Sequence, residues 1–129
     1  MKKLLLWAPR VLGILFTLFL MMFSLDVFEL EASFWELVGG FLIHSIPAFI
    51  LAAIVAIAWK RPIIGAVGFL LADGFYIIWM IIVAIQNDHP FGQALNWTWP
   101  LAGPAFLVVV LYYLSWVDSR KRLEFKEQS

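Results

Sequence analysis

The sequence predicts an all-α integral membrane protein: one domain, residues 1–129, folded as an antiparallel bundle of four transmembrane helices with both termini in the cytoplasm. The first observation is composition, because 64% of the residues are hydrophobic and only 14% are charged, against roughly 45–50% and about 25% in soluble domains. The second is length: four apolar stretches reach the ~20 residues that a helix needs to cross a bilayer. The third is the placement of the basic residues, which four spans bring to one side of the membrane.

The first span covers residues 4–25 and carries a single charge, Arg10. A cleaved secretory signal is the alternative interpretation, because Lys2 and Lys3 precede the apolar run. That run is longer than the roughly 7–15 residues of a signal core, and no small-x-small cleavage site follows it. We therefore expect an uncleaved helix that ends near Asp26.

The second span, residues 37–59, follows a capping-box pattern in which Ser33 stands three residues before Glu36. This spacing predicts a helix that begins near Phe34. The third span, residues 63–85, follows Pro62, which suits the first turn of a helix because proline has no amide hydrogen to donate there.

The fourth span, residues 97–117, follows a polar, turn-forming segment at 86–92. Trp97 and Trp99 mark its entry into the membrane, because tryptophan is enriched at membrane interfaces. The charged segment 118–129 is expected to be a short solvated extension of this helix. Because all the connections are short, consecutive helices should be antiparallel neighbours.

The orientation follows from the basic residues, which the positive-inside rule places in the cytoplasm. All nine lie at the start of the chain, in the second connection or in the tail, and these three regions share one side of a four-span protein. The other side has no lysine or arginine and carries five acidic residues instead: Asp26, Glu29, Glu31, Glu36 and Asp88. We therefore expect a multi-pass protein of the inner (cytoplasmic) membrane.

Ionisable side chains inside a membrane are candidates for function, and three stand out: Asp73, His44 and Arg10. Asp73 should lie near the bilayer midplane and shares a helix face with Tyr76. Two interpretations compete. Asp73 could form a buried ion pair with Arg10 that fixes helix register, or it could exchange protons or a cation with an internal cavity.

His44 lies three residues before Pro47, whose missing amide hydrogen frees the carbonyl of Ile43. With Ser45, these groups could line a polar pocket that opens outward, or they could satisfy one another. Asp26, Asp88 and His89 are the outer-face candidates that could join His44 in a metal or haem site. A lone histidine between small residues more often forms an interhelical hydrogen bond.

Several function classes have no support in the sequence. The chain has no cysteine and no net charge, which removes thiol chemistry and any global attraction for nucleic acid. It lacks the glycine-rich phosphate-binding motifs, and no nucleophile, base and orienting group occur at a recognisable spacing. We therefore expect no enzyme activity, no cofactor, no bound metal and no nucleic-acid partner.

Five segments carry a family resemblance: 9–10, 13–16, 23–28, 40–47 and 58–62, which read PR, GILF, FSLDVF, GFLIHSIP and AWKRP. Together they resemble a group of small prokaryotic four-helix membrane proteins whose domain has no known function. The resemblance is close over the first half of the chain and general in the rest. It implies a four-helix membrane protein of prokaryotic origin and draws attention to residues in the matching segments, namely Arg10, Asp26, His44, Pro47 and Lys60. It transfers no activity.

The leading functional hypothesis is a non-enzymatic accessory or interaction module. Its expected partners are the lipid bilayer and either a second copy of itself or another membrane protein. The alternative is a small proton- or cation-coupled transporter that uses Asp73, and an outward-facing metal or haem protein that uses His44 ranks third.

Overall fold

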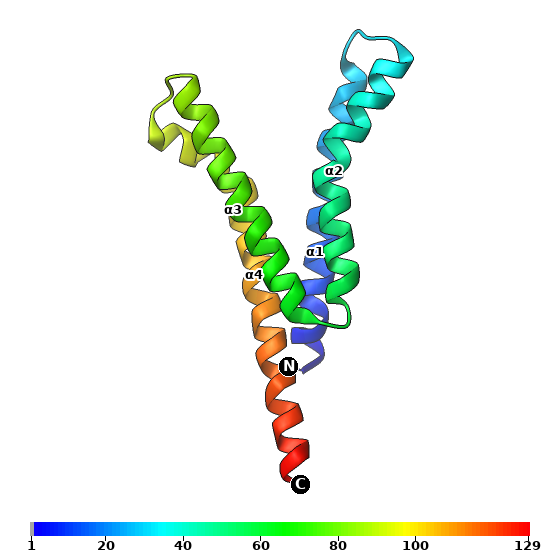
Figure 1. Ribbon diagram of the computed structural model, residues 1–129, viewed down its shortest axis with the longest axis vertical. Coiled ribbons are helices and arrows are strands. Elements are labelled where there is room, and N and C mark those ends of the chain that lie inside the picture. Colours follow the sequence, from blue (N-terminus) through cyan, green and yellow to red (C-terminus); the bar gives the residue numbers. More distant parts are fainter. Residues whose placement is uncertain (1) are drawn as a thin grey trace.

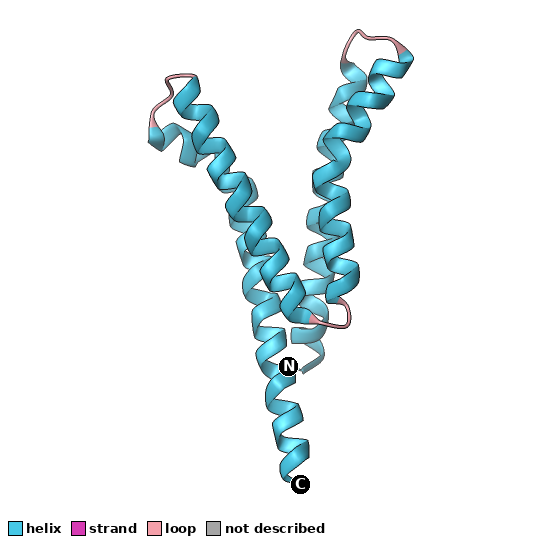
Figure 2. Ribbon diagram, viewed as in Figure 1, coloured by secondary structure: helices cyan, strands magenta, loops and turns pink. Residues whose placement is uncertain are grey.

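The computed structural model describes residues 2–129, and these residues are almost entirely helical, with no strand among them (Figures 1 and 2). The elements in chain order are α1 (Lys2–Ser24), a short 3-10 helix η1 (Leu25–Glu29), α2 (Phe34–Ala58), α3 (Pro62–Gln86) and α4 (Phe91–Gln128). All four α-helices are long and apolar enough to span a membrane. The prediction of an all-helical fold with four such helices is confirmed.

The helices form two antiparallel hairpins, which we call the first arm (α1 and α2) and the second arm (α3 and α4). The arms meet at the end that holds the α2–α3 turn and diverge toward their tips, so the molecule is V-shaped (Figure 1). We call these the joined end and the open end. Between the arms, α1 packs on α4 and α2 packs on α3. The expected compact bundle therefore exists only near the joined end.

Side-chain size explains where the arms separate. Near the joined end, glycine lets α3 approach α2: a Cβ at Gly68 would lie 2.7 Å from Ile54. Seven residues, about two turns, further toward the open end, the same face of α3 carries Phe75, whose side chain is exposed. The core fills the joined end and consists of residues from α2, α3 and α4, with α1 packed against it: Leu51, Val55, Ala58, Ala66, Phe69, Val108, Val109 and Tyr112.

The helix ends largely agree with the sequence predictions. Both hydrogen bonds of the capping box are present, because the Ser33 amide donates to a Glu36 carboxylate oxygen at 2.9 Å and the Glu36 amide donates to the Ser33 hydroxyl at 3.4 Å. Pro62 is the first residue of α3, as expected. The helical tail is also confirmed, since α4 continues to Gln128.

The start of α4 is the main difference from the prediction. The helix begins at Phe91 rather than near Trp97, directly after Pro90, whose carbonyl accepts from the amides of Gln93 and Ala94. Proline restrains the backbone at this entry and suits a position just before the helix. The polar residues that favoured a turn therefore extend only to Pro90, and α4 is 38 residues long.

Candidate functional site

Arg10 lies at the joined end, where it contacts the last turn of α2. Its guanidinium donates to the backbone carbonyl of Trp59 at 2.6 Å. The same group lies 4.4 Å from the centroid of the Trp59 ring and 5.3 Å from that of Trp7, and these two rings pack edge to face. The last carbonyls of a helix lack intrahelical donors, and a cation there also complements the helix dipole. Arg10 therefore caps α2.

Asp73 lies in the second arm, on the face of α3 that packs against α4. Gly65 of α3 is opposite Tyr112 of α4, so the antiparallel register places Asp73, two turns further along, near Ala105. Only 6% of Asp73 is exposed, and its Oδ1 atom is buried without a hydrogen-bond partner among residues 2–129. The residues of α4 that are buried near this level are the small apolar Ala102 and Ala105.

The proposed ion pair between Asp73 and Arg10 does not form. Within residues 2–129 the one salt bridge joins Asp118 and Arg122 in the tail of α4. Axial position alone suggested that an extended arginine could reach Asp73. The structure places the two residues at different levels, because Gly13 and Gly65 both lie against Tyr112. At 1.5 Å per residue, Arg10 is ~4 Å from that level toward the joined end and Asp73 ~12 Å from it toward the open end. Arg10 is also bound to the carbonyl of Trp59 at the end of α2. The interpretation of these two residues as a register-fixing pair is therefore wrong.

Tyr76 is one turn closer to the open end than Asp73 and is half-buried. Its position agrees with the predicted shared face, because residues three apart on a helix lie on one side. The core ends at this depth, since Ala72 is the last residue of α3 that packs against it. Asp73 and Tyr76 thus lie where the arms begin to separate.

His44 and Ser45 point in different directions, so they neither line a common polar pocket nor bond to each other, which were the two alternatives for them. His44 is exposed, and its Nδ1 lies 2.9 Å from the Gly40 carbonyl one turn earlier. Since a carbonyl can only accept, Nδ1 carries the hydrogen in this arrangement. Ser45 is fully buried on the neighbouring face, with no partner for its hydroxyl among the described residues.

The outer-face candidates are divided between the two arms. Asp26 lies in η1 at the tip of the first arm, whereas Asp88 and His89 are exposed at the tip of the second. His89 packs edge to face on Trp97, with ring centroids 4.9 Å apart. No group of three or more His, Asp or Glu side chains suited to a metal occurs within residues 2–129. The structure therefore does not bring Asp26, His44 and His89 together.

Tyr112 is a buried polar residue whose role the sequence analysis missed. It is 1% exposed, and its hydroxyl has no hydrogen-bond partner among the described residues. Its place near the end of the fourth predicted span is typical of an interfacial aromatic residue. A usable signal was present, because small residues recur at helical spacing on the same face as Tyr112, at Ala105 and Ser115. Such a face indicates packing against other helices.

Ser24 and Ser45 are the other buried hydroxyls without partners. The antiparallel register of the first arm places them at one level, because Gly13 is opposite Val55 and Gly40 is opposite Val27. Two surface hollows, of about 240 and 430 Å³, have apolar linings. Neither hollow includes Arg10, His44 or Asp73.

A family model described as a domain of unknown function, DUF7670, matches residues 1–124 of the chain. The resemblance to a family without a known function is thereby confirmed, and it extends over nearly the whole chain rather than the first half. The prokaryotic origin stays a prediction. No curated protein and no solved structure matches this chain.

Proposed function

We propose that this chain, which belongs to the DUF7670 family of unknown function, acts as a non-enzymatic interaction module of the cytoplasmic membrane. Its four helices span the bilayer, with both termini in the cytoplasm. The open side of the V receives a membrane-embedded helix of a second copy or of another membrane protein. The observation that carries this proposal is the divergence of the two arms, which leaves apolar inner faces uncovered by the rest of the chain.

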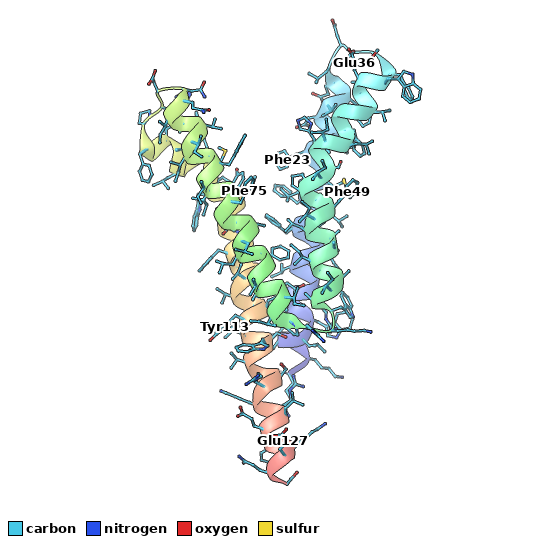
Figure 3. All side chains as sticks on the ribbon, viewed as in Figure 1. Phe23, Glu36, Phe49, Phe75, Tyr113 and Glu127 are labelled. Carbon is cyan, nitrogen blue, oxygen red and sulfur yellow. The ribbon has the colours of Figure 1, made fainter. Side chains whose placement is uncertain are left out.

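The inner face of the first arm can be followed along α1. Phe16 packs across the joined end on Phe69 of α3, with ring centroids 6.3 Å apart. Phe23 is seven residues further on and so lies on the same face, nearer the open end. It is 50% exposed, and Figure 3 shows it on the side of the first arm that faces the second.

The inner face of the second arm can be followed along α3 in the same way. Gly68 contacts Ile54 of α2, and Phe75 is seven residues further on. Its ring stacks on Trp79, with centroids 6.4 Å apart, and 70% of Phe75 is exposed (Figure 3). Two aromatic faces therefore flank the opening. Aromatic side chains commonly dominate the energetics of protein interfaces.

Photo-crosslinking from the inner faces tests this role. A photoreactive amino acid is placed at Phe23, at Phe75 or at Phe49, and the membranes are irradiated. Phe49 is the matched control, because it is 48% exposed, close to the value for Phe23, but lies on the outer side of the first arm. We expect crosslinks to polypeptide from Phe23 and Phe75, with lipid adducts alone from Phe49.

The identity of the crosslinked polypeptide decides between the two partners. An adduct of twice the chain mass indicates a second copy, whereas any other mass indicates a different membrane protein. If all three positions give only lipid adducts, the opening is filled by lipid and the interaction role is wrong.

A second candidate function is proton- or cation-coupled transport through Asp73. The observation that favours it is the buried Oδ1 atom without a partner, together with the engagement of Arg10 by Trp59. An intramembrane carboxyl group that lacks a structural partner is a candidate for ion exchange. Its position where the arms begin to separate would give it access from the open side.

Reconstitution tests the transport hypothesis. Proteoliposomes that contain the wild-type chain are loaded with a pH-sensitive dye and given a proton or potassium gradient. Transport through Asp73 predicts a flux that Asp73→Asn abolishes, while Asp26→Asn, at the exposed tip of the first arm, retains it. Equal leakage from all three preparations would exclude the hypothesis.

A further inference from the structure

Apart from Arg10, the basic residues at or beyond the joined end fall into two groups that differ in their local counter-charges. One group comprises Lys2 and Lys3 at the start of α1 and Lys60 and Arg61 in the α2–α3 turn. No acidic residue occurs in segments 1–25 or 37–72, so the sequence neighbours of this group supply no negative charge. All four side chains are exposed, and none forms an ion pair with another residue in the described range 2–129. We call this group the basic collar.

The second group lies in the tail of α4, where charges of both signs alternate. Segment 118–129 holds four basic and three acidic residues. Arg122 pairs with Asp118, and the Arg120 guanidinium lies 5.6 Å from the centroid of the Trp116 ring. At 1.5 Å per residue, the helix carries Glu127 ~16 Å beyond Trp116. The tail is therefore partly neutralised and points away from the rest of the molecule (Figure 3).

Two tryptophans fix the depth of the basic collar relative to a membrane. Trp7 and Trp59 pack together at the joined end, with ring centroids 5.7 Å apart, and tryptophan prefers the headgroup region of a bilayer. Lys60 and Arg61 directly follow Trp59 in the chain. The turn therefore lies at headgroup level once the helices span the membrane. Arg10 is held by Trp59 and Trp7, which leaves the collar residues as the accessible cations next to these two tryptophans.

We propose that the basic collar binds the phosphate headgroups of anionic phospholipids, and that the tail of α4 does not. This inference goes beyond the proposed function but rests on its premise that the helices span a bilayer. Uncompensated lysine and arginine at the membrane surface attract anionic lipid, whereas Lys126 at the end of the tail, ~15 Å beyond Trp116, lies past the screening length of about 10 Å. The alternating charges of the tail add little to the attraction for anionic lipid, because neighbouring positive and negative charges cancel.

Lipid titration of the purified chain tests the proposal. The probe is dioleoylphosphatidylglycerol, with dioleoylphosphatidylcholine as the neutral reference, and native mass spectrometry measures the bound fraction. The variant Lys60→Gln/Arg61→Gln removes two charges from the collar, and Arg120→Gln/Lys121→Gln removes two from the tail. We expect the collar variant to weaken the preference for phosphatidylglycerol by about 5-fold for each charge removed. The tail variant should change it by less than about twofold.

Two further variants protect the test against loss of the fold. Lys60→Arg/Arg61→Lys keeps the charge of the turn and should keep the lipid preference. Lys2→Gln/Lys3→Gln alters only the exposed start of α1 and should weaken the preference without affecting the core. Equal losses from the collar and tail variants would show that net charge alone matters and would overturn the proposal. An unchanged preference in both Lys60→Gln/Arg61→Gln and Lys2→Gln/Lys3→Gln would also overturn it. Neither result affects the crosslinking test at Phe23.

Discussion

The ring of Tyr112 in α4 lies directly against the backbone of Gly65 in α3. A Cβ atom at residue 65 would lie 2.6 Å from two ring carbons of Tyr112, which is closer than nonbonded atoms approach. The hydroxyl of the same tyrosine would lie 3.4 Å from a Cβ at Gly13 in α1. The Tyr112 ring also packs on Phe69, with centroids 5.9 Å apart. Tyr112 therefore connects the two arms at the joined end, and two glycines make the space for it.

Gly65→Ala should destabilise the protein. The added methyl group overlaps the Tyr112 ring, and overpacking of a filled core typically costs about 1–3 kcal/mol. Thermal unfolding in detergent, followed by tryptophan fluorescence, measures the change. Gly74→Ala is the matched control on the same helix, because a Cβ there meets no atom within 4 Å. Equal midpoints for the two variants would show that the contact between Gly65 and Tyr112 is absent.

Tyr112→Phe should leave the stability unchanged or increase it. The hydroxyl is buried and has no hydrogen-bond partner among residues 2–129, and removing an unsatisfied buried polar group relieves a cost of about 1–3 kcal/mol. Tyr113→Phe on the exposed neighbouring position is the control. A loss of stability in Tyr112→Phe, measured by the same unfolding assay, would mean that the hydroxyl has a partner such as a bound water.

Arg10→Gln should lower the stability by about 1 kcal/mol, because it removes a charge-assisted hydrogen bond and two contacts with aromatic rings. Arg10→Lys should recover only part of this loss, since an ammonium group lacks the planar shape that stacks on tryptophan. The fluorescence of Trp7 and Trp59 reports the same contact. Arg61→Gln, at an exposed site without an ion pair, is the control and should unfold at the same temperature as the wild type.

The orientation prediction can be tested because the chain contains no cysteine. Single cysteines are placed at Glu31, in the connection between η1 and α2, and at Ser129 in the tail. A membrane-impermeant maleimide added to intact cells should label Glu31→Cys and leave Ser129→Cys unlabelled until the cells are opened. The positive-inside rule gives this expectation, because the basic residues lie on the side of the tail. The reverse labelling pattern would contradict it.

The helices could be predicted from the sequence because their signals are local. Apolar length, the capping box at Ser33 and Pro62 at the start of α3 each depend on a few neighbouring residues. The divergence of the arms could not be predicted in this way. The divergence depends on which faces of different helices meet. The contact of Gly68 in α3 with Ile54 in α2 is an example.

The same limit applied to the candidate site. The sequence located Asp73 and Arg10 along their helices, and the rise per residue suggested that they could meet. The sequence could not give the register that puts Gly13 and Gly65 level at Tyr112 and so separates the two residues by ~16 Å along the helix axes. It could not give the direction of each side chain around its helix axis relative to a third helix. His44 and Ser45 show the same effect, because adjacent residues of one helix point about 100° apart and entered different environments.

Asp73 and Arg10 should behave as independent residues in a double-mutant cycle. Asp73→Asn keeps the shape of the side chain while removing its charge, and Asp73 has no cationic partner among the described residues. We therefore expect Asp73→Asn to fold, and its effect on the free energy of unfolding to add to that of Arg10→Gln within about 0.5 kcal/mol. Unfolding of both single variants and the double variant measures the coupling. A coupling energy well above 1 kcal/mol would restore the ion pair that the geometry contradicts, because each charge would then depend on the other for its neutralisation.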